Sequence, residues 1–185
     1  MRLFAALHLP ETYQERLAAL TERLSKRLDS RITWTRPGNW HLTLKFLGET
    51  DPETAERVLG ALAAVRFESF SLLAGGGGFF PGPLKPRVIW VGLRQGASEA
   101  AALARDVERV LVPLGFPPEK REFRPHLTIG RVKRHRKDPW KDVEAELQEV
   151  LWPEALVEAF TLYKSTLTPK GPVYQPLLEV PAGRE

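Results

Sequence analysis

Two short stretches of the sequence share one pattern, a histidine followed by leucine, threonine and an aliphatic residue. They occupy residues 41–44 and 126–129. Residues two positions apart in a β-strand point to the same face. As strands, the two stretches would each present one imidazole and one hydroxyl on one face and two aliphatic side chains on the other. Because imidazole titrates near neutral pH, this pattern indicates proton transfer.

The two histidines lie 85 residues apart, close to half of the 185-residue chain. This spacing indicates an internal duplication in which each half supplies one motif strand. Two such strands, related by approximate twofold symmetry, would face each other across a cleft. One imidazole can then act as a base and the other as an acid. We therefore predict that His41 and His126 are catalytic and that the hydroxyls of Thr43 and Thr128 bind a phosphate. The residues alone leave open which histidine is the acid.

A single histidine on an apolar strand is more often an interior residue than a catalytic one. Two histidines in matched contexts favour the catalytic interpretation for the pair. The other two, His8 and His135, lack the pattern. We expect a structural role for His8 at a strand end. His135 lies in the basic run 133–137, which either contacts RNA phosphates or faces solvent.

Residues next to the motifs are candidates for binding the rest of a substrate. Phe46 and Arg131 each lie five positions after a motif histidine, where a phenyl ring can stack on a base and a guanidinium can hold a phosphate. Strict alternation turns both away from the cleft unless the strand bulges first. Alternation places Lys45 on the face of the first motif, at its rim. It places Gly130 likewise in the second strand, where a missing side chain leaves room for substrate.

The elements that position these residues follow from apolar periodicity and turn signals. We predict strands at 2–9, 32–35, 40–47, 67–73, 87–93, 125–132, 156–167 and 172–180, with a turn at 168–171. Helices are predicted at 11–29, from an N-cap at Asp51, at 98–114 with Ser98 as N-cap, and from 138 to about 151. The four glycines at 75–78 are predicted to be a flexible connection, because no P-loop lysine and serine or threonine follow them. The irregular order favours an α+β fold with antiparallel sheets.

The amino-acid composition excludes several classes of site and of protein. The chain has no cysteine, which excludes disulfides, thiolate zinc sites and iron–sulfur clusters. Its net charge of +4 permits a polyanionic partner without requiring one. We see no apolar run near the ~20 residues that span a bilayer, and no secretory signal. We therefore expect no membrane association and a cytoplasmic location.

The sequence around both motifs resembles the 2H phosphoesterase superfamily, which is named for two His-x-Thr-x motifs. It is most similar to the RNA 2′,3′-cyclic phosphodiesterases, historically called 2′-5′ RNA ligases. The resemblance is carried by residues 2–6, 40–48, 124–131, 162–165 and 171–174, and both motifs are intact.

The resemblance implies a bilobal α+β fold with two pseudo-symmetric lobes. Each lobe has an antiparallel sheet flanked by helices, and residues 1–185 form one domain of two intertwined lobes with the site between them. It also implies hydrolysis of a 3′-terminal 2′,3′-cyclic phosphate on RNA to a 2′-phosphomonoester. His41 would be the proton donor and His126 the proton acceptor, with no metal or other cofactor. Ligation through a 2′-5′ bond is the same chemistry in reverse.

The expected partner is RNA with a 2′,3′-cyclic phosphate end, tRNA fragments among the candidates, and the expected state is a monomer. Two alternatives stay open at this point. One is a 2H relative that acts on small cyclic nucleotides or 2′-5′ oligoadenylate. The other is a non-catalytic RNA-binding module, against which the presence of both histidines and both threonines argues.

Overall fold

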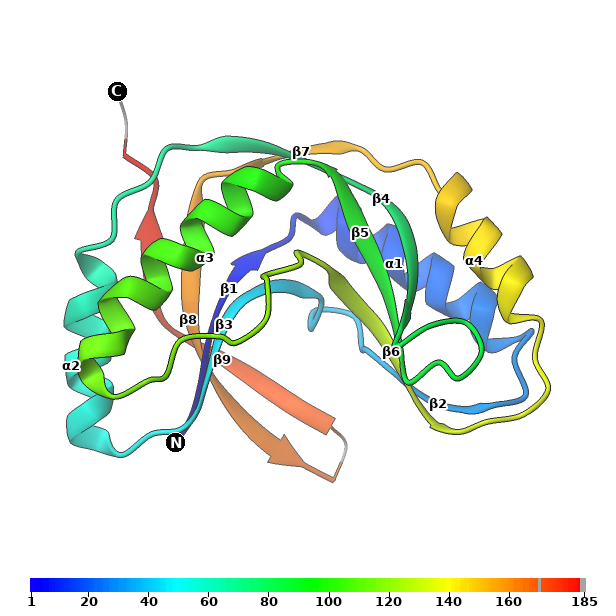
Figure 1. Cartoon of the computed structure of the whole chain (residues 1–185), viewed down its shortest axis with the longest axis horizontal. Coiled ribbons are helices and arrows are strands. Elements are labelled where there is room, and N and C mark those ends of the chain that lie inside the picture. The colour runs from blue at the N-terminus through cyan, green and yellow to red at the C-terminus, as the bar shows by residue number, and fades with distance from the viewer. Residues whose placement is uncertain (170, 184–185) are drawn as a thin grey trace.

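Two antiparallel β-sheets form the frame of the protein (Figure 1). The structure is a computed structural model and describes residues 1–169 and 171–183. The strands are β1 (Arg2–His8), β2 (Arg31–Trp34), β3 (His41–Glu49), β4 (Phe70–Phe80), β5 (Val88–Gln95), β6 (Leu127–Arg134), β7 (Glu154–Val157), β8 (Ala159–Thr168) and β9 (Gly171–Pro181). The helices are α1 (Glu11–Ser25), α2 (Pro52–Ala63), α3 (Ala97–Leu111) and α4 (Trp140–Glu149), with a short 3₁₀ turn at Val112–Leu114.

The two sheets share a three-strand arrangement. The first has the order β3-β1-β8-β9 and the second the order β2-β6-β5-β4-β7. In each, a motif strand (β3 or β6) pairs with a central strand (β1 or β5), which pairs in turn with β8 or β4. This is the pseudo-symmetric α+β architecture that the sequence predicts.

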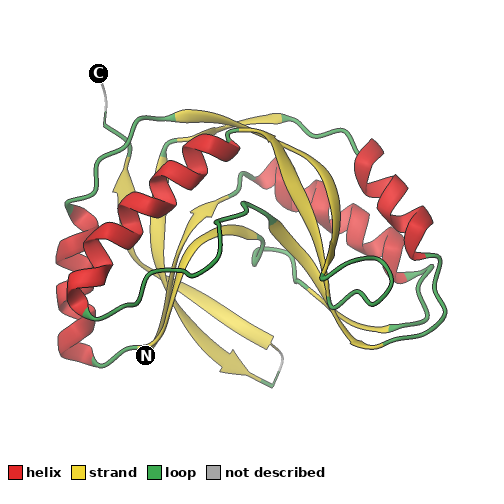
Figure 2. Ribbon diagram, in the orientation of Figure 1, coloured by secondary structure: helices red, strands yellow, loops and turns green. Residues whose placement is uncertain are grey.

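Each sheet is covered by a helix that follows a strand of the other sheet. Helices α2 and α3 pack on the first sheet, α3 against β3 and α2 against β9. Helices α1 and α4 pack on the second sheet, against β6 and β4 (Figure 2). Because α1 follows β1 and α3 follows β5, the chain crosses between the sheets repeatedly.

The aliphatic residues of both motifs lie in the core, as strand alternation predicts. Leu42, Leu127 and Ile129 are fully buried and Leu44 is nearly so. They pack with apolar residues of the helices such as Leu17 in α1. None of the helices in the described part of the chain is long and apolar enough to cross a membrane.

The prediction that residues 75–78 form a flexible connection is wrong, because all four glycines lie inside β4 and the strand pairs with β5. Glycine is required there by close approach rather than by a turn. A Cβ on Gly77 would lie 2.7 Å from the backbone oxygen of Trp90, and one on Gly78 would lie 3.1 Å from the Trp90 ring.

Several boundaries also differ from prediction. The single strand expected at 156–167 is two strands: β7 pairs with β4 in the second sheet, and β8 pairs with β1 in the first. Helix α3 begins one residue before Ser98, after a left-handed Gly96. The predicted turn at 168–171 includes Lys170, which lies outside the described residues; on either side of it, Thr168 pairs with Gly171.

Candidate active site

The two motif strands come together although they belong to different sheets. His41 opens β3, and His126 immediately precedes β6. Strands β3 and β6 lie against each other where the sheets meet (Figure 1). Both histidines and both motif threonines are partly exposed. A duplicated strand therefore delivers the same two functional groups from each side.

Each motif histidine is held by an equivalent hydrogen bond to the backbone carbonyl two residues before it. Nδ1 of His41 lies 2.8 Å from the carbonyl oxygen of Asn39, and Nδ1 of His126 lies 2.7 Å from that of Arg124. A carbonyl oxygen only accepts hydrogen bonds, so Nδ1 carries the proton in both rings. The neutral tautomer leaves Nε2 as the atom that accepts a proton, and the charged form donates from the same atom.

Aromatic rings pack on both histidines, more closely on His41. The centroid of the His41 ring lies 4.7 Å from that of Phe4 and 5.2 Å from that of Tyr174. Among the described residues, His126 has one such neighbour, Phe80, edge-on at 5.2 Å. Burial lowers the pKa of His41 to about 4, against the Asn39 hydrogen bond that raises it. His41 is therefore neutral at pH 7 in the unliganded protein.

Each motif strand contains a β-bulge at the fourth residue of the motif. Thr43 pairs with Ala6 and Lys45 pairs with Ala5, so Leu44 is an extra residue in β3. In β6, Thr128 and Gly130 pair with consecutive residues of β5, so Ile129 is extra. An extra residue shifts the alternation of every side chain that follows it. The two halves of the chain thus share a local irregularity as well as a sequence pattern.

The bulges bring Phe46 and Arg131 to the same face as the motif threonines. Phe46 pairs with Phe4, the ring that packs on His41, and its own side chain is 59% exposed. Arg131 is exposed, and its charge opposes the burial that raises the pKa of Tyr174. Since Tyr174 packs on His41, Arg131 of the second motif strand lies within electrostatic range of the first motif's surroundings.

Lys45 does not lie on the face of the first motif, where strand alternation predicts it. The bulge turns its side chain to the interior, where it is 3% exposed, away from the face of the motif. Its ammonium donates to Oε1 of Glu108 at 2.7 Å, the Pro117 carbonyl oxygen at 2.8 Å and Oε1 of Glu119 at 3.2 Å. All three of its protons have acceptors, so Lys45 is not placed to line the rim.

Lys45 instead joins the first motif strand to the loop that leads into the second motif. Glu108 also accepts from the backbone N–H of Glu119, at 2.7 Å, and the Lys45 hydrogen bond is the main cause that lowers the pKa of Glu108. A few residues later the same loop supplies the Arg124 carbonyl that orients His126. The ion pair therefore fixes both ends of the site relative to each other.

The space beside Gly130 is not open to substrate, although strand alternation predicts it to be. A Cβ there would lie 3.0 Å from Cγ2 of Ile32 and 3.0 Å from Cε3 of Trp34. The missing side chain makes room for these two residues of β2 rather than for substrate.

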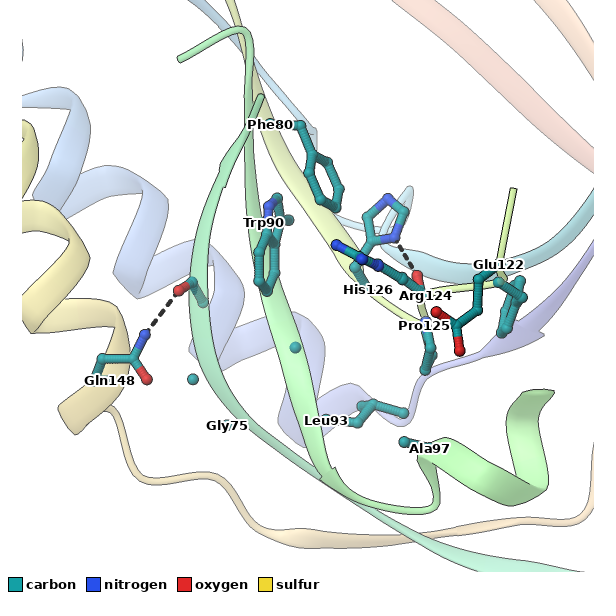
Figure 3. Close-up of a pocket in the computed structure, with 14 residues that line it drawn as sticks. Gly75, Phe80, Trp90, Leu93, Ala97, Glu122, Arg124, Pro125, His126 and Gln148 are labelled. Carbon is teal, nitrogen blue, oxygen red and sulfur yellow. Dashed lines mark hydrogen bonds between the residues drawn. The ribbon is translucent and has the colours of Figure 1, made fainter. Parts of the chain in front are cut away.

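A pocket of about 440 Å³ opens beside His126 (Figure 3). It lies between strands β4 and β5 and the loop 122–125, with Trp90 and Phe80 at the His126 end and Ala97 at the other. Within residues 1–169 and 171–183, no three histidine, aspartate or glutamate side chains are grouped so that they could hold a metal ion.

Comparison with known proteins accounts for the duplication. The family model of the LigT like Phosphoesterase matches residues 7–90 and again 91–174, with one motif in each copy. The chain belongs to this family. An RNA 2′,3′-cyclic phosphodiesterase of Archaeoglobus fulgidus is 37% identical over 96% of this chain and 98% of its own length. An RNA 2′,3′-cyclic phosphodiesterase of Aeropyrum pernix is 41% identical over 78% of this chain and 82% of its own length. The predicted resemblance is confirmed.

Solved structures of other proteins share the whole fold. The crystal structure of TT0787 of Thermus thermophilus has a TM-score of 0.81 and 29% identity, covering 98% of this chain and 97% of that one. Apo LigT of E. coli has a TM-score of 0.78 and 25% identity, covering 99% and 98%. The bilobal duplication seen here is therefore the fold of the family.

Some residues around the histidines were not identified from the sequence. Asn39 and Arg124 each lie two positions before a motif histidine, so extending the repeat backwards would have found their carbonyl groups. Phe4, Tyr174 and Phe80 carry no such signal, because only strand pairing brings them to the imidazole rings.

The Lys45 ion pair predicts a specific loss of stability. Lys45→Met keeps the aliphatic stem but removes the three hydrogen bonds that the ammonium donates, so the free energy of unfolding should fall by about 2 kcal/mol. Lys26→Met removes an exposed pair with Glu22, which water screens, and should lower the free energy of unfolding much less. Urea unfolding of both variants makes the comparison. Equal losses would show that Lys45 does not anchor the loop.

Burial of neutral His41 predicts that the protein loses stability in mild acid. Between pH 6.5 and about 4 the unfolded chain binds a proton that folded His41 does not, so unfolding becomes easier as the pH falls. The loss should approach about 3 kcal/mol at pH 4. Urea unfolding between pH 7 and 4 should show a shallower decline for His41→Gln, whereas His135→Gln, at an exposed site, should behave as wild type. Identical declines for His41→Gln and wild type would contradict the assignment.

Proposed function

We propose that this protein hydrolyses the 2′,3′-cyclic phosphate at the 3′ end of RNA and leaves a 2′-phosphomonoester. The observation that carries the proposal is the matched pair of histidines, each with Nδ1 bound to the carbonyl two residues before it. Such a pair offers two Nε2 atoms from adjacent strands for one proton transfer each. Relatives named RNA 2′,3′-cyclic phosphodiesterase support the reaction class.

In the proposed reaction, Nε2 of His126 removes a proton from water, and the water oxygen attacks phosphorus. The bond from phosphorus to the 3′ oxygen breaks, and Nε2 of His41 gives its proton to that oxygen. The hydroxyls of Thr43 and Thr128 donate to the non-bridging oxygens. Arg131 adds a positive charge beside the phosphate, and Phe46 offers an exposed ring for base stacking.

The acid role requires His41 to gain a proton when substrate binds. Its pKa of about 4 keeps it neutral in the unliganded protein, but an adjacent phosphate anion favours the charged form. Burial then makes the imidazolium a stronger acid than an exposed one, which suits protonation of an alkoxide leaving group. Two aromatic rings pack on His41 and one packs on His126, and this difference in surroundings supports different roles for two groups held by equivalent hydrogen bonds.

The same groups run the reaction in reverse when an RNA 5′ hydroxyl takes the place of water, which forms a 2′-5′ bond. E. coli LigT has been solved in complex with phosphate and with 3′-AMP, which supports a phosphate and nucleotide site in this fold. We further propose that the protein acts as a monomer in the cytoplasm, on RNA ends that include those of tRNA fragments.

Removal of either imidazole tests the proposal. His41→Ala and His126→Ala should each lower kcat by about 10²–10⁴-fold on an RNA that ends in a 2′,3′-cyclic phosphate. Both variants should stay folded by circular dichroism, and His135→Ala should keep wild-type turnover. A folded variant of either motif histidine with near-normal turnover would contradict its role.

The identity of the product and the response to chelation form a second test. Because the mechanism uses only imidazole, hydroxyl and guanidinium groups, hydrolysis should proceed at the same rate in EDTA. Phosphorus NMR should show a 2′-phosphate, since the 3′ oxygen leaves. Loss of activity in EDTA that zinc or magnesium restores would overturn the mechanism, and a 3′-phosphate would reverse the proposed substrate orientation.

A further inference from the structure

The pocket beside His126 has a flat aromatic and glycine-rich floor. The Trp90 indole lies over the strand positions of Gly78 and Gly92, where an added Cβ would lie 3.1 Å and 3.3 Å from the ring. The Phe80 ring stacks against Trp90 with the centroids 5.1 Å apart. A floor of this kind leaves a slot for a planar ring, which aromatic side chains bind by stacking. Its volume, about 440 Å³, is in the range of small-molecule sites.

The rim of the pocket is polar and charged. Glu122 and Arg124, which line it from the loop that leads into the second motif, are both exposed. Gln148 of α4 lines the far side, where its Nε2 donates to the Gly77 carbonyl oxygen at 2.8 Å (Figure 3). Stacking surface below and hydrogen-bonding groups at the edge match a nucleobase better than an aliphatic ligand.

The pocket belongs to one side of the proposed reaction. His126 lines it, and Trp90 pairs directly with Thr128 across β5 and β6. Of the described residues that line it, none comes from the first motif. In the proposed mechanism His126 activates the nucleophile, whereas His41 protonates the leaving 3′ oxygen. A group in this pocket is therefore on the side from which phosphorus is attacked.

We propose that this pocket binds the nucleoside at the 5′-hydroxyl end of a second RNA and so directs that hydroxyl, in place of water, to the cyclic phosphate. The inference rests on the proposed function and adds to it the location and chemistry of the acceptor site. His126 takes the proton of the 5′ hydroxyl, whose oxygen forms a bond to phosphorus. The bond to the 3′ oxygen breaks, and His41 protonates that oxygen. The product is a 2′-5′ phosphodiester, and no further reactant is required.

A competition between acceptors tests the pocket. RNA with a 2′,3′-cyclic phosphate is incubated with adenosine, or with methyl riboside, which has the 5′ hydroxyl but no base. Mass spectrometry then measures the ratio of transfer product to hydrolysis product in the same tube. The ratio should be at least tenfold higher with adenosine than with methyl riboside at equal concentration. Because both products form in one tube, this ratio does not depend on how much of the enzyme is folded.

Two matched variants of α3 test whether the preference for adenosine arises in this pocket. Ala97→Phe fills the pocket and should lower the adenosine ratio tenfold or more, towards that of methyl riboside. Ala102→Phe makes the same change on the same helix but outside the pocket lining, and should keep the wild-type ratio. Hydrolysis with equal ratios for both acceptors, or an unchanged ratio in Ala97→Phe, would overturn the inference and leave the proposed function standing. Absence of hydrolysis in wild type would overturn the proposed function, and this inference with it.

Discussion

One extra residue at the fourth motif position of each motif strand determines how the site is assembled. The bulges at Leu44 and Ile129 leave each histidine and threonine on one face but reverse the side chains that follow. Without them, Phe46 and Arg131 would point into the core, and Lys45 would lie on the open face. A bulge commonly re-aims a side chain next to an active site. Here the same bulge occurs twice, so the duplication preserves backbone geometry along with the residues of the motif.

The buried ion pair of Lys45 depends on that geometry and joins the two halves. Once the bulge turns Lys45 inward, its ammonium holds Glu108 of α3 and the loop near Pro117 and Glu119. This loop forms one wall of the pocket and ends at the carbonyl that orients His126. The position of the second histidine is therefore tied to the strand of the first. In the proposed mechanism the acid and the base must keep a fixed separation to act on one phosphate, and this would give the ion pair a role beyond stability.

The sequence predicted much of the fold because the motif and the helices carry local signals. Alternation placed Leu42 and Leu127 in the core, where the structure has them, and the repeat singled out His41 and His126, whose Nδ1 atoms the structure holds by equivalent hydrogen bonds. The predictions that are wrong concern residues whose conformation depends on pairing with a strand distant in the sequence. Local preference made the glycines at 75–78 a loop, but pairing with β5 and the space taken by Trp90 make them a strand. Lys45 was misplaced for the same reason, since a bulge depends on the partner strand.

The proposed mechanism depends most on His41 acting as the acid and His126 as the base. The direct measurement is the pH dependence of kcat on RNA with a 2′,3′-cyclic phosphate, for wild type and both alanine variants. Wild type should give a bell-shaped profile that reports both groups in the bound complex. His126→Ala should lose the limb that rises with pH, and His41→Ala should lose the limb that falls. Retention of both limbs in either variant, or loss of the opposite limb, would contradict the account.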